Sequence, residues 1–306
     1  AMLTIVEAWM GALAYTMQLY FDFSGYSDMA IGAARLFGIQ LPLNFNSPYK
    51  AVNIIDFWGR WHMTLTRFLT RYLYNPIALN LSRSRMQRGQ SLIKRGVGSF
   101  GAYLELVAFP TVITMFLAGL WHGAGWQYIV FGLLHGLYLV VNHGWHMLLK
   151  ARGHEPAKAG WFQKRLGHMI TFGCVIVAMV FFRAPSVNNA ISVLSAMLGA
   201  NGISLSDGAL FSNQLFSNSK LGLLWLMILM AIAFFTPNTQ EWLSDHQPAL
   251  GHQPTLDKQS EIGWLTFVQK HLRWQPTQAW AIVTAAIATT SFLGLSGVSE
   301  FIYFQF

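Results

Sequence analysis

The segment 116–135, FLAGLWHGAGWQYIVFGLLH, joins two long apolar runs through a break that is rich in glycine. His122 lies between Trp121 and Gly123 at this break, and His135 lies inside the second run. Each run is about as long as a bilayer is thick, since a helix rises ~1.5 Å per residue and the hydrocarbon core measures ~30 Å. Ionisable side chains are costly at this depth, and a histidine can move a proton near neutral pH. The default hypothesis is therefore a pair of membrane helices whose histidines serve a function.

The composition indicates the same class of protein. Hydrophobic residues make up 54% of the 306 residues and charged residues only 10%, whereas a soluble domain has ~25% charged residues. We therefore expect an all-α, multi-pass transmembrane protein. The net charge of +8 does not indicate nucleic acid, because the basic residues lie in short loops beside apolar spans. The single cysteine, Cys174, excludes an intrachain disulfide and argues against a cysteine-based metal site.

Apolar runs predict membrane spans at residues 2–21, 101–121, 126–149, 166–182, 219–236 and 277–295. Residues 61–81 predict a tilted, interfacial or re-entrant helix, and residues 188–200 a short interfacial helix. Two basic loops, 82–95 and 150–165, flank the out-and-back pair 101–121 and 126–149. They should therefore lie on one side of the membrane, which the positive-inside rule makes cytoplasmic. Residues 238–276 should form a polar loop on the membrane surface, and the C-terminus should lie outside.

Polar motifs interrupt the first part of the chain. The motif FDFSGYSDMAIG (21–32) places Asp22 and Asp28 beside an apolar span, either at a capped helix end or as the polar lining of a buried cavity. The motif LPLNFNSPY (41–49) contains Asn44, which lies either in a simple turn or near a catalytic histidine or a substrate carbonyl that it orients.

A third motif, DFWGRWHMTLTRFL (56–69), places Asp56, Arg60 and His62 among Trp58 and Trp61. It is either an interfacial belt of aromatic and basic residues or part of a functional site. No set of ligands has the spacing of a metal site, so we expect no metal. Nucleotide-binding loops, nucleophile elbows and zinc-protease motifs are absent from the sequence, so chemistry here must rest on histidine, hydroxyl and carboxylate groups.

These three motifs, together with AGLWHGAGW, FGLLHG and the terminal FIYFQF, resemble the membrane-bound O-acyltransferase family. The resemblance is closest to its bacterial branch, typified by the alginate O-acetyltransferase membrane subunit, and more distant to the teichoic-acid D-alanyltransferase membrane subunit. It is dense over residues 15–145. Close alginate-type relatives usually read FWRRWH, whereas this chain has Gly59 in place of one arginine. They also tend to read RDYLYIPLGG, whereas residues 70–76 of this chain contain no aspartate.

The resemblance implies one membrane domain over residues 1–306, with helices around a buried cavity in the bacterial inner membrane. It implies acyl transfer from a cytoplasmic thioester such as acetyl-CoA, with no bound cofactor, to a cell-surface polysaccharide, with extracytoplasmic partner proteins. The family's catalytic histidine falls on His122 and its second functional histidine on His62. We expect His122 to act as general base and further residues to bind or orient the substrates, namely Asn44, Asp56, Arg60, Trp121, His135, Asp22 and Asp28.

Two alternatives remain open at this point. One is transfer of D-alanine to teichoic acid, and the other, from a different class, is a transporter with an intramembrane His/Asp proton relay. Family members carry more helices ahead of the FDFSG motif, and this chain begins with Ala1 directly before an apolar run. We therefore expect that an N-terminal part of the natural protein is missing and that the 306-residue piece alone is inactive.

Overall fold

The computed structural model describes residues 3–202, 219–250 and 273–294, and within these ranges the chain forms helices and turns with no β-strand beyond isolated bridges. The chain divides into two compact units. The first unit contains Ala1–Gln18 and Ser47–Phe234, and the second contains Leu19–Asn46 and Phe235–Phe306. The expectation of a helical protein is thus confirmed for the described residues.

The first helix, α1 (Ile5–Leu36), is much longer than the predicted span 2–21 and continues through the FDFSG motif. Asp22 and Asp28 therefore lie within a helix, and the interpretation of this motif as a capped helix end is wrong. The glycines of the motif cost ~1 kcal/mol each in a helix, but buried contacts such as those of Tyr20 and Ile31, which are 7% and 6% exposed, hold the helix together.

An aromatic cluster forms the core of the first unit around η1 (Pro48–Lys50) and α2 (Ile54–Trp58). Trp58 and Trp61 are buried there, at 8% and 7% exposure, so they do not form an interfacial belt. The rings of Phe57 and Trp61 stack with centroids 5.7 Å apart. This cluster replaces the predicted belt because its aromatic rings bury far more apolar area than an interfacial position would.

Two long helices contain a π-turn that precedes a proline. The first continuous helix comprises α3 (Met63–Leu69), η2 (Thr70–Tyr74) and α4 (Asn75–Gln87), and the second comprises α5 (Phe100–Tyr103), η3 (Leu104–Ala108) and α6 (Phe109–Trp121). The amides of Asn75 and Phe109 donate five residues back, to Thr70 and Leu104. Proline supplies no N–H in the next turn, and the wider turn accommodates this loss. The helix that ends at Gln87 also covers part of the predicted basic loop 82–95.

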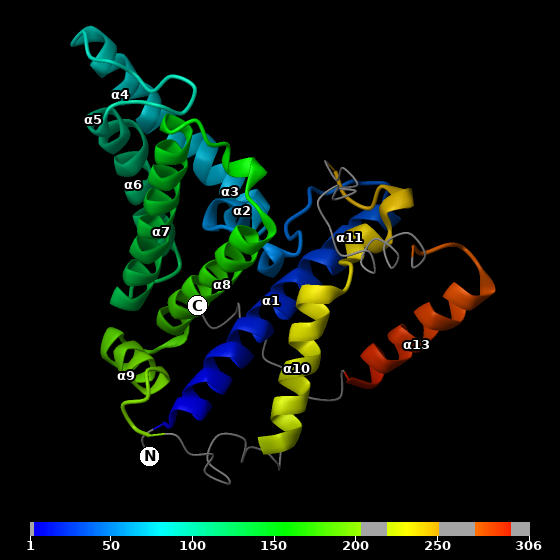
Figure 1. Cartoon of the computed structure of the whole chain (residues 1–306). Coiled ribbons are helices and arrows are strands. Elements are labelled where there is room, and N and C mark those ends of the chain that lie inside the picture. Colours follow the sequence, from blue (N-terminus) through cyan, green and yellow to red (C-terminus); the bar gives the residue numbers. More distant parts are fainter. Residues whose placement is uncertain (1–2, 203–218, 251–272, 295–306) are drawn as a thin grey trace. The chain divides into compact units, whose positions relative to one another are not determined.

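The helices α6 and α7 (Trp126–Ala151) form a close antiparallel pair (Figure 1). A Cβ atom at Gly119 would lie 2.4 Å from the Tyr128 carbonyl oxygen, and one at Gly132 would lie 2.3 Å from the Met115 carbonyl oxygen. Both distances are shorter than any real contact, so only glycine permits this approach.

Of the remaining helices, α8 (Trp161–Arg183), α10 (Ser219–Phe235) and α13 (Gln278–Gly294) correspond to predicted spans and α9 (Val187–Met197) to the predicted interfacial helix. Three short helices, η4 (Pro156–Lys158), α11 (Thr239–Trp242) and η5 (Ser244–His246), lie within predicted loops. Among the described residues, Phe100–Trp121 and Trp161–Arg183 are long and apolar enough to cross a membrane. The motif FIYFQF and most of the predicted loop 238–276 lie outside the described residues.

Candidate active site

His122 lies where α6 ends, at the turn that leads into α7. It occupies the C-cap position of α6, and its amide donates to the Gly119 carbonyl oxygen at 3.1 Å. Its half-buried ring contacts the rings of Trp121, Phe131 and Phe182, with centroids 4.9, 5.9 and 5.0 Å apart. The catalytic candidate is therefore held by aromatic rings from three helices.

The turn that carries His122 requires glycine. Gly123 has a φ of +153°, and a Cβ atom at this position would lie 2.7 Å from the Tyr128 ring. A side chain would therefore meet both an unfavourable backbone and an occupied space. This is the physical reason for the glycine that follows His122 in the motif.

His135 lies on α7, one helical turn beyond Phe131, and is fully buried. The indole Nε1 of Trp58 donates to His135 Nδ1 at 3.3 Å. The Phe57 ring stacks on the imidazole with centroids 6.1 Å apart, and the Phe131 ring packs edge-on at 4.7 Å. Because Nδ1 accepts, the proton of the neutral ring belongs on Nε2. That nitrogen has no hydrogen-bond partner among the described residues, so it is a buried donor in an aromatic cage.

His62 precedes α3 and has a left-handed backbone, with φ 42° and ψ 54°. This conformation costs a non-glycine residue ~1–3 kcal/mol and is concentrated at functional sites. Burial lowers the pKa of His62 from 6.5 to about 4. Burial, and to a smaller extent the neighbouring His62, lower the pKa of His122 from 6.5 to about 4.

The structure thus brings three predicted site residues together. His62 and His122 are close enough to influence each other's charge, and His122 and His135 contact the same Phe131 ring. His62 and His122 are neutral at pH 7, which is the form that can accept a proton. The arrangement is suited to general-base chemistry.

Asp56 lies on α2 and pairs with groups close to it in the chain. Its Oδ1 accepts from Arg60 Nε at 2.7 Å, and its Oδ2 accepts from the Val52 amide at 3.2 Å. The carboxylate is therefore engaged on both oxygens. The ion pair of Asp56 with Arg60 stabilises the short helix α2, which also carries Trp58, the hydrogen-bond donor to His135.

Asn44, Asp22 and Asp28 belong to the second unit. Asn44 Nδ2 donates to Ser27 Oγ at 3.1 Å, and Gln240 Nε2 donates to Asp28 Oδ1 at 2.8 Å. Asp22 is half-buried on α1. The polar pairs of this unit include Gln240, which is 2% exposed and which the sequence motifs did not indicate.

Two further features of the site were not predicted. Phe182, from α8, closes one side of His122, and Trp58 fixes the His135 tautomer. Phe182 is the last residue of a predicted span, but no local sequence pattern indicates that it contacts His122. The same holds for Trp58 and His135, which are also distant in the chain. Within the described ranges, no three His, Cys, Asp or Glu side chains are grouped so that they could hold a metal ion.

Comparison with known proteins identifies the family. Residues 1–93 match the model of MBOAT, the membrane-bound O-acyltransferase family. The peptidoglycan O-acetyltransferase of Helicobacter pylori is 45% identical over 205 residues, which are 66% of this chain and 34% of that protein. A Pseudomonas putida protein named "Probable alginate O-acetylase" is 32% identical over 306 residues, which are 99% of this chain and 54% of that protein. The teichoic acid D-alanyltransferase of Streptococcus thermophilus is 33% identical over 175 residues, which are 55% of this chain and 39% of that protein.

The chain belongs to the membrane-bound O-acyltransferase family. Within that family it belongs to the branch that resembles the alginate O-acetylases. The resemblance predicted from the motifs is thereby confirmed. The chain spans 34% and 54% of the two O-acetylating relatives described above, so it corresponds to about half of such a protein or less.

Proposed function

We propose that the protein transfers an acetyl group from acetyl-CoA, or another cytoplasmic thioester, to a hydroxyl of a cell-surface polysaccharide or of a partner protein that relays it. The observation that carries this proposal is the arrangement around His122 at the glycine-bounded junction of α6 and α7: His62 is close enough to lower its pKa, and His135 shares the Phe131 ring with it. The names of the relatives support acetyl as the group transferred, because two of them describe O-acetylation of polysaccharides.

We propose a multi-pass orientation in the bacterial inner membrane, with the two basic stretches in the cytoplasm. A Cβ atom at Gly96, beside the first stretch, would lie 2.9 Å from Nζ of Lys150, where the second stretch begins. The two stretches therefore lie on one side of the first unit, as the positive-inside rule requires. His122 lies at the opposite end of α6, so the acceptor approaches from the extracytoplasmic side and the donor from the basic side. Helices that do not cross the membrane, such as α9, are interfacial in this proposal.

The mechanism follows from the neutral histidines. His122 takes the proton of the acceptor hydroxyl, and the resulting oxygen attacks the thioester carbonyl carbon. The tetrahedral intermediate then collapses, the C–S bond breaks, and the thiolate receives the proton from the imidazolium. Such a base contributes typically ~10²–10⁴-fold to the rate.

Neighbouring groups complete the proposed machinery. His62 positions the thioester end or passes the proton to the leaving sulfur, and His135 holds the ring cage behind His122. The Trp121 indole is our choice as a donor to the developing oxyanion, because it lies against His122 and is 61% exposed. Asp56 with Arg60 supports the helix α2, which carries Trp58.

The test follows radiolabel from acetyl-CoA into polysaccharide in membranes that contain the protein. We expect ester-linked label with wild type and a loss of ~10²–10⁴-fold with His122→Ala. The variant His154→Ala, in an exposed loop, serves as the control and should keep the activity. A transporter would give no ester-linked label. A D-alanyl transferase would transfer label only from a D-alanyl thioester, and either result would overturn the proposal.

A further inference from the structure

The ring of His122 lies against a wall of aromatic side chains from α7 and α8. The Phe182 ring, from α8, packs against the imidazole with centroids 5.0 Å apart, and the Phe131 ring, from α7, packs with centroids 5.9 Å apart. The two phenyl rings also contact each other, with centroids 4.9 Å apart. Edge-to-face rings are in direct contact at such distances, so Phe131 and Phe182 present one continuous apolar surface to His122.

The α7 part of this aromatic wall is rigid, because Phe131 is packed from behind. Its ring contacts the His135 ring with centroids 4.7 Å apart, and His135 is fully buried and accepts a hydrogen bond from Trp58. Phe131 itself is 5% exposed. A buried ring that is enclosed by other buried rings cannot swing aside without opening a cavity, which is costly in a close-packed interior.

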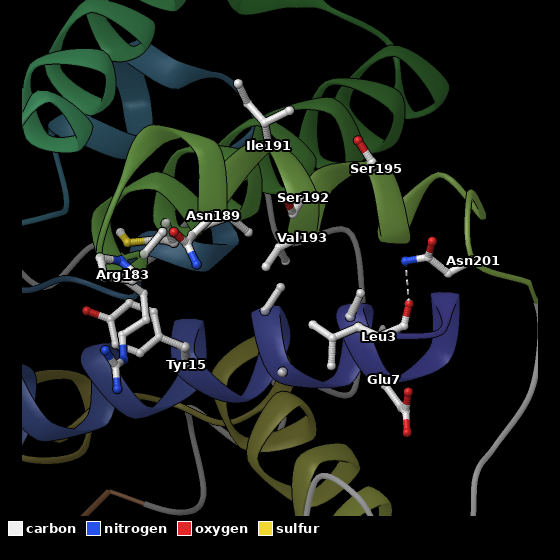
Figure 2. A pocket seen from close by; sticks show the side chains of 17 residues that line it. Leu3, Glu7, Tyr15, Arg183, Asn189, Ile191, Ser192, Val193, Ser195 and Asn201 are labelled. Carbon is white, nitrogen blue, oxygen red and sulfur yellow. Dashed lines mark hydrogen bonds between the residues drawn. The ribbon is translucent and has the colours of Figure 1, made fainter. Parts of the chain in front are cut away.

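The α8 part of the wall is also held on more than one side. The Tyr128 ring packs edge-on against Phe182 with centroids 5.5 Å apart, and Tyr128 itself lies against Gly123. The next residue of α8, Arg183, anchors the end of the helix on α1. Its guanidinium carbon lies 5.7 Å from the centre of the Tyr15 ring, at one end of the pocket drawn in Figure 2. The wall therefore presents a fixed shape to a substrate at His122.

The proposed mechanism places the acyl group within reach of this wall. The acceptor hydroxyl lies ~2.6–3.2 Å from its base, and the thioester carbonyl carbon lies ~3–3.5 Å from that hydroxyl before the attack. The carbonyl carbon is therefore at most about 6–7 Å from the reacting nitrogen of His122. The two phenyl rings lie at a similar distance from the imidazole, so the acyl chain meets them as soon as it leaves the carbonyl carbon on their side.

The trigonal geometry of the carbonyl carbon sets the direction of the acyl chain. The oxygen, the sulfur and the first chain carbon spread evenly around this carbon in one plane. In the proposed function the oxygen points to the Trp121 indole, which is 61% exposed and marks the open side of His122. The sulfur leaves towards the basic side. The direction that remains for the acyl chain is that of Phe131 and Phe182.

We infer that Phe131 and Phe182 determine the length of the acyl group, because a two-carbon group fits against the wall and each further methylene collides with it. This role rests on the proposed function, since it concerns the acyl group that is transferred at His122. One methylene more or fewer in an apolar pocket changes kcat/KM by ~10–200-fold. Phe182 lies closer to the imidazole than Phe131, at 5.0 against 5.9 Å, so it contributes the larger part of the discrimination.

The test measures kcat/KM for transfer from radiolabelled acetyl-, propionyl- and butyryl-CoA to polysaccharide in membrane vesicles that contain the protein. For wild type we expect the value to fall ~10–200-fold from acetyl to propionyl and to fall again for butyryl. Phe182→Leu replaces the ring by a shorter side chain and should bring the acetyl and propionyl values to within a few-fold of each other. Phe182→Ala should extend this gain to butyryl. The ratio between two thioesters in one preparation does not depend on how much of a variant is folded, so a loss of stability cannot imitate the result.

Phe181→Leu is the matched control, because Phe181 precedes Phe182 on α8 and is also buried, at 8% exposure. Its ring does not contact the His122 ring in the described part of the chain, so this variant should keep the wild-type ratio. If Phe182→Ala fails to accumulate in the membrane, Phe131→Leu takes its place and should also narrow the acetyl-to-propionyl ratio. Equal transfer of all three groups by the wild type, or an unchanged ratio in Phe182→Leu, overturns the inference alone. Absence of transfer from all three thioesters by the wild type overturns the proposed function itself.

Discussion

The close crossing of α6 and α7 is what positions the histidines, and Gly132→Ala tests this directly. A Cβ atom at Gly132 would lie 2.3 Å from the Met115 carbonyl oxygen, whereas ordinary contacts begin near 3.4 Å. The obstacle is backbone and not a flexible side chain, so the helices must separate locally by about 1 Å. Overpacking of this kind costs ~1–3 kcal/mol.

The same separation displaces the reacting groups. His135 and Phe131 flank Gly132 on α7, and His122 follows Gly119 on α6. A misplacement of ~1 Å at a catalytic site costs on the order of 10²-fold in rate. We therefore expect Gly132→Ala to lower acyl transfer about a hundred-fold.

The assay compares acetyl transfer and thermal stability of Gly132→Ala with those of Gly173→Ala. Gly173 lies within α8, and a Cβ atom there would meet nothing within 4 Å. Alanine is favoured over glycine in a helix by ~0.5–1 kcal/mol, so Gly173→Ala should be active and at least as stable as wild type. Wild-type activity in Gly132→Ala would refute the argument that the helix crossing sets the site.

Three further predictions concern the histidines. Burial lowers the pKa of His122 to about 4, so its neutral form persists as the pH falls. In a plot of kcat/KM against pH, the fall in activity on the acid side should therefore lie near pH 4. A fall near the ordinary histidine pKa of ~6.5 would contradict this. His62→Gly should be more stable to heat than His62→Ala by ~1 kcal/mol, because glycine adopts φ 42° without strain; equal stability would contradict the strained backbone. Trp58→Phe should lower the Tm, because it leaves His135 Nδ1 without its donor at a cost of ~1–3 kcal/mol, and an unchanged Tm would count against that hydrogen bond.

Several helices were predictable because their apolar runs are long. The predicted spans 126–149 and 219–236 correspond to the helices α7 and α10 within a few residues. The end of α1 was not predictable, because the polar residues of the FDFSG motif are poor helix formers and are tolerated only through tertiary contacts such as that between Asp28 and Gln240.

The site was predictable in its residue types and not in its geometry. The pattern Gly-x-x-His occurs at both Gly119 and Gly132, so the sequence already held the spacing that brings His122 and His135 together. The partner of each ring depends on segments that are distant in the chain, such as Trp58 for His135. The ion pair of Asp56 with Arg60, by contrast, joins residues one helical turn apart, a spacing that the sequence shows directly.

The most direct measurement of the central claim is ester-linked acetate on the surface polysaccharide of the host, compared between wild type and His122→Ala at equal protein levels in the membrane. We expect acetate to be lost in His122→Ala and kept in His154→Ala. Unchanged acetate in His122→Ala would contradict the role of His122 as the base in acyl transfer.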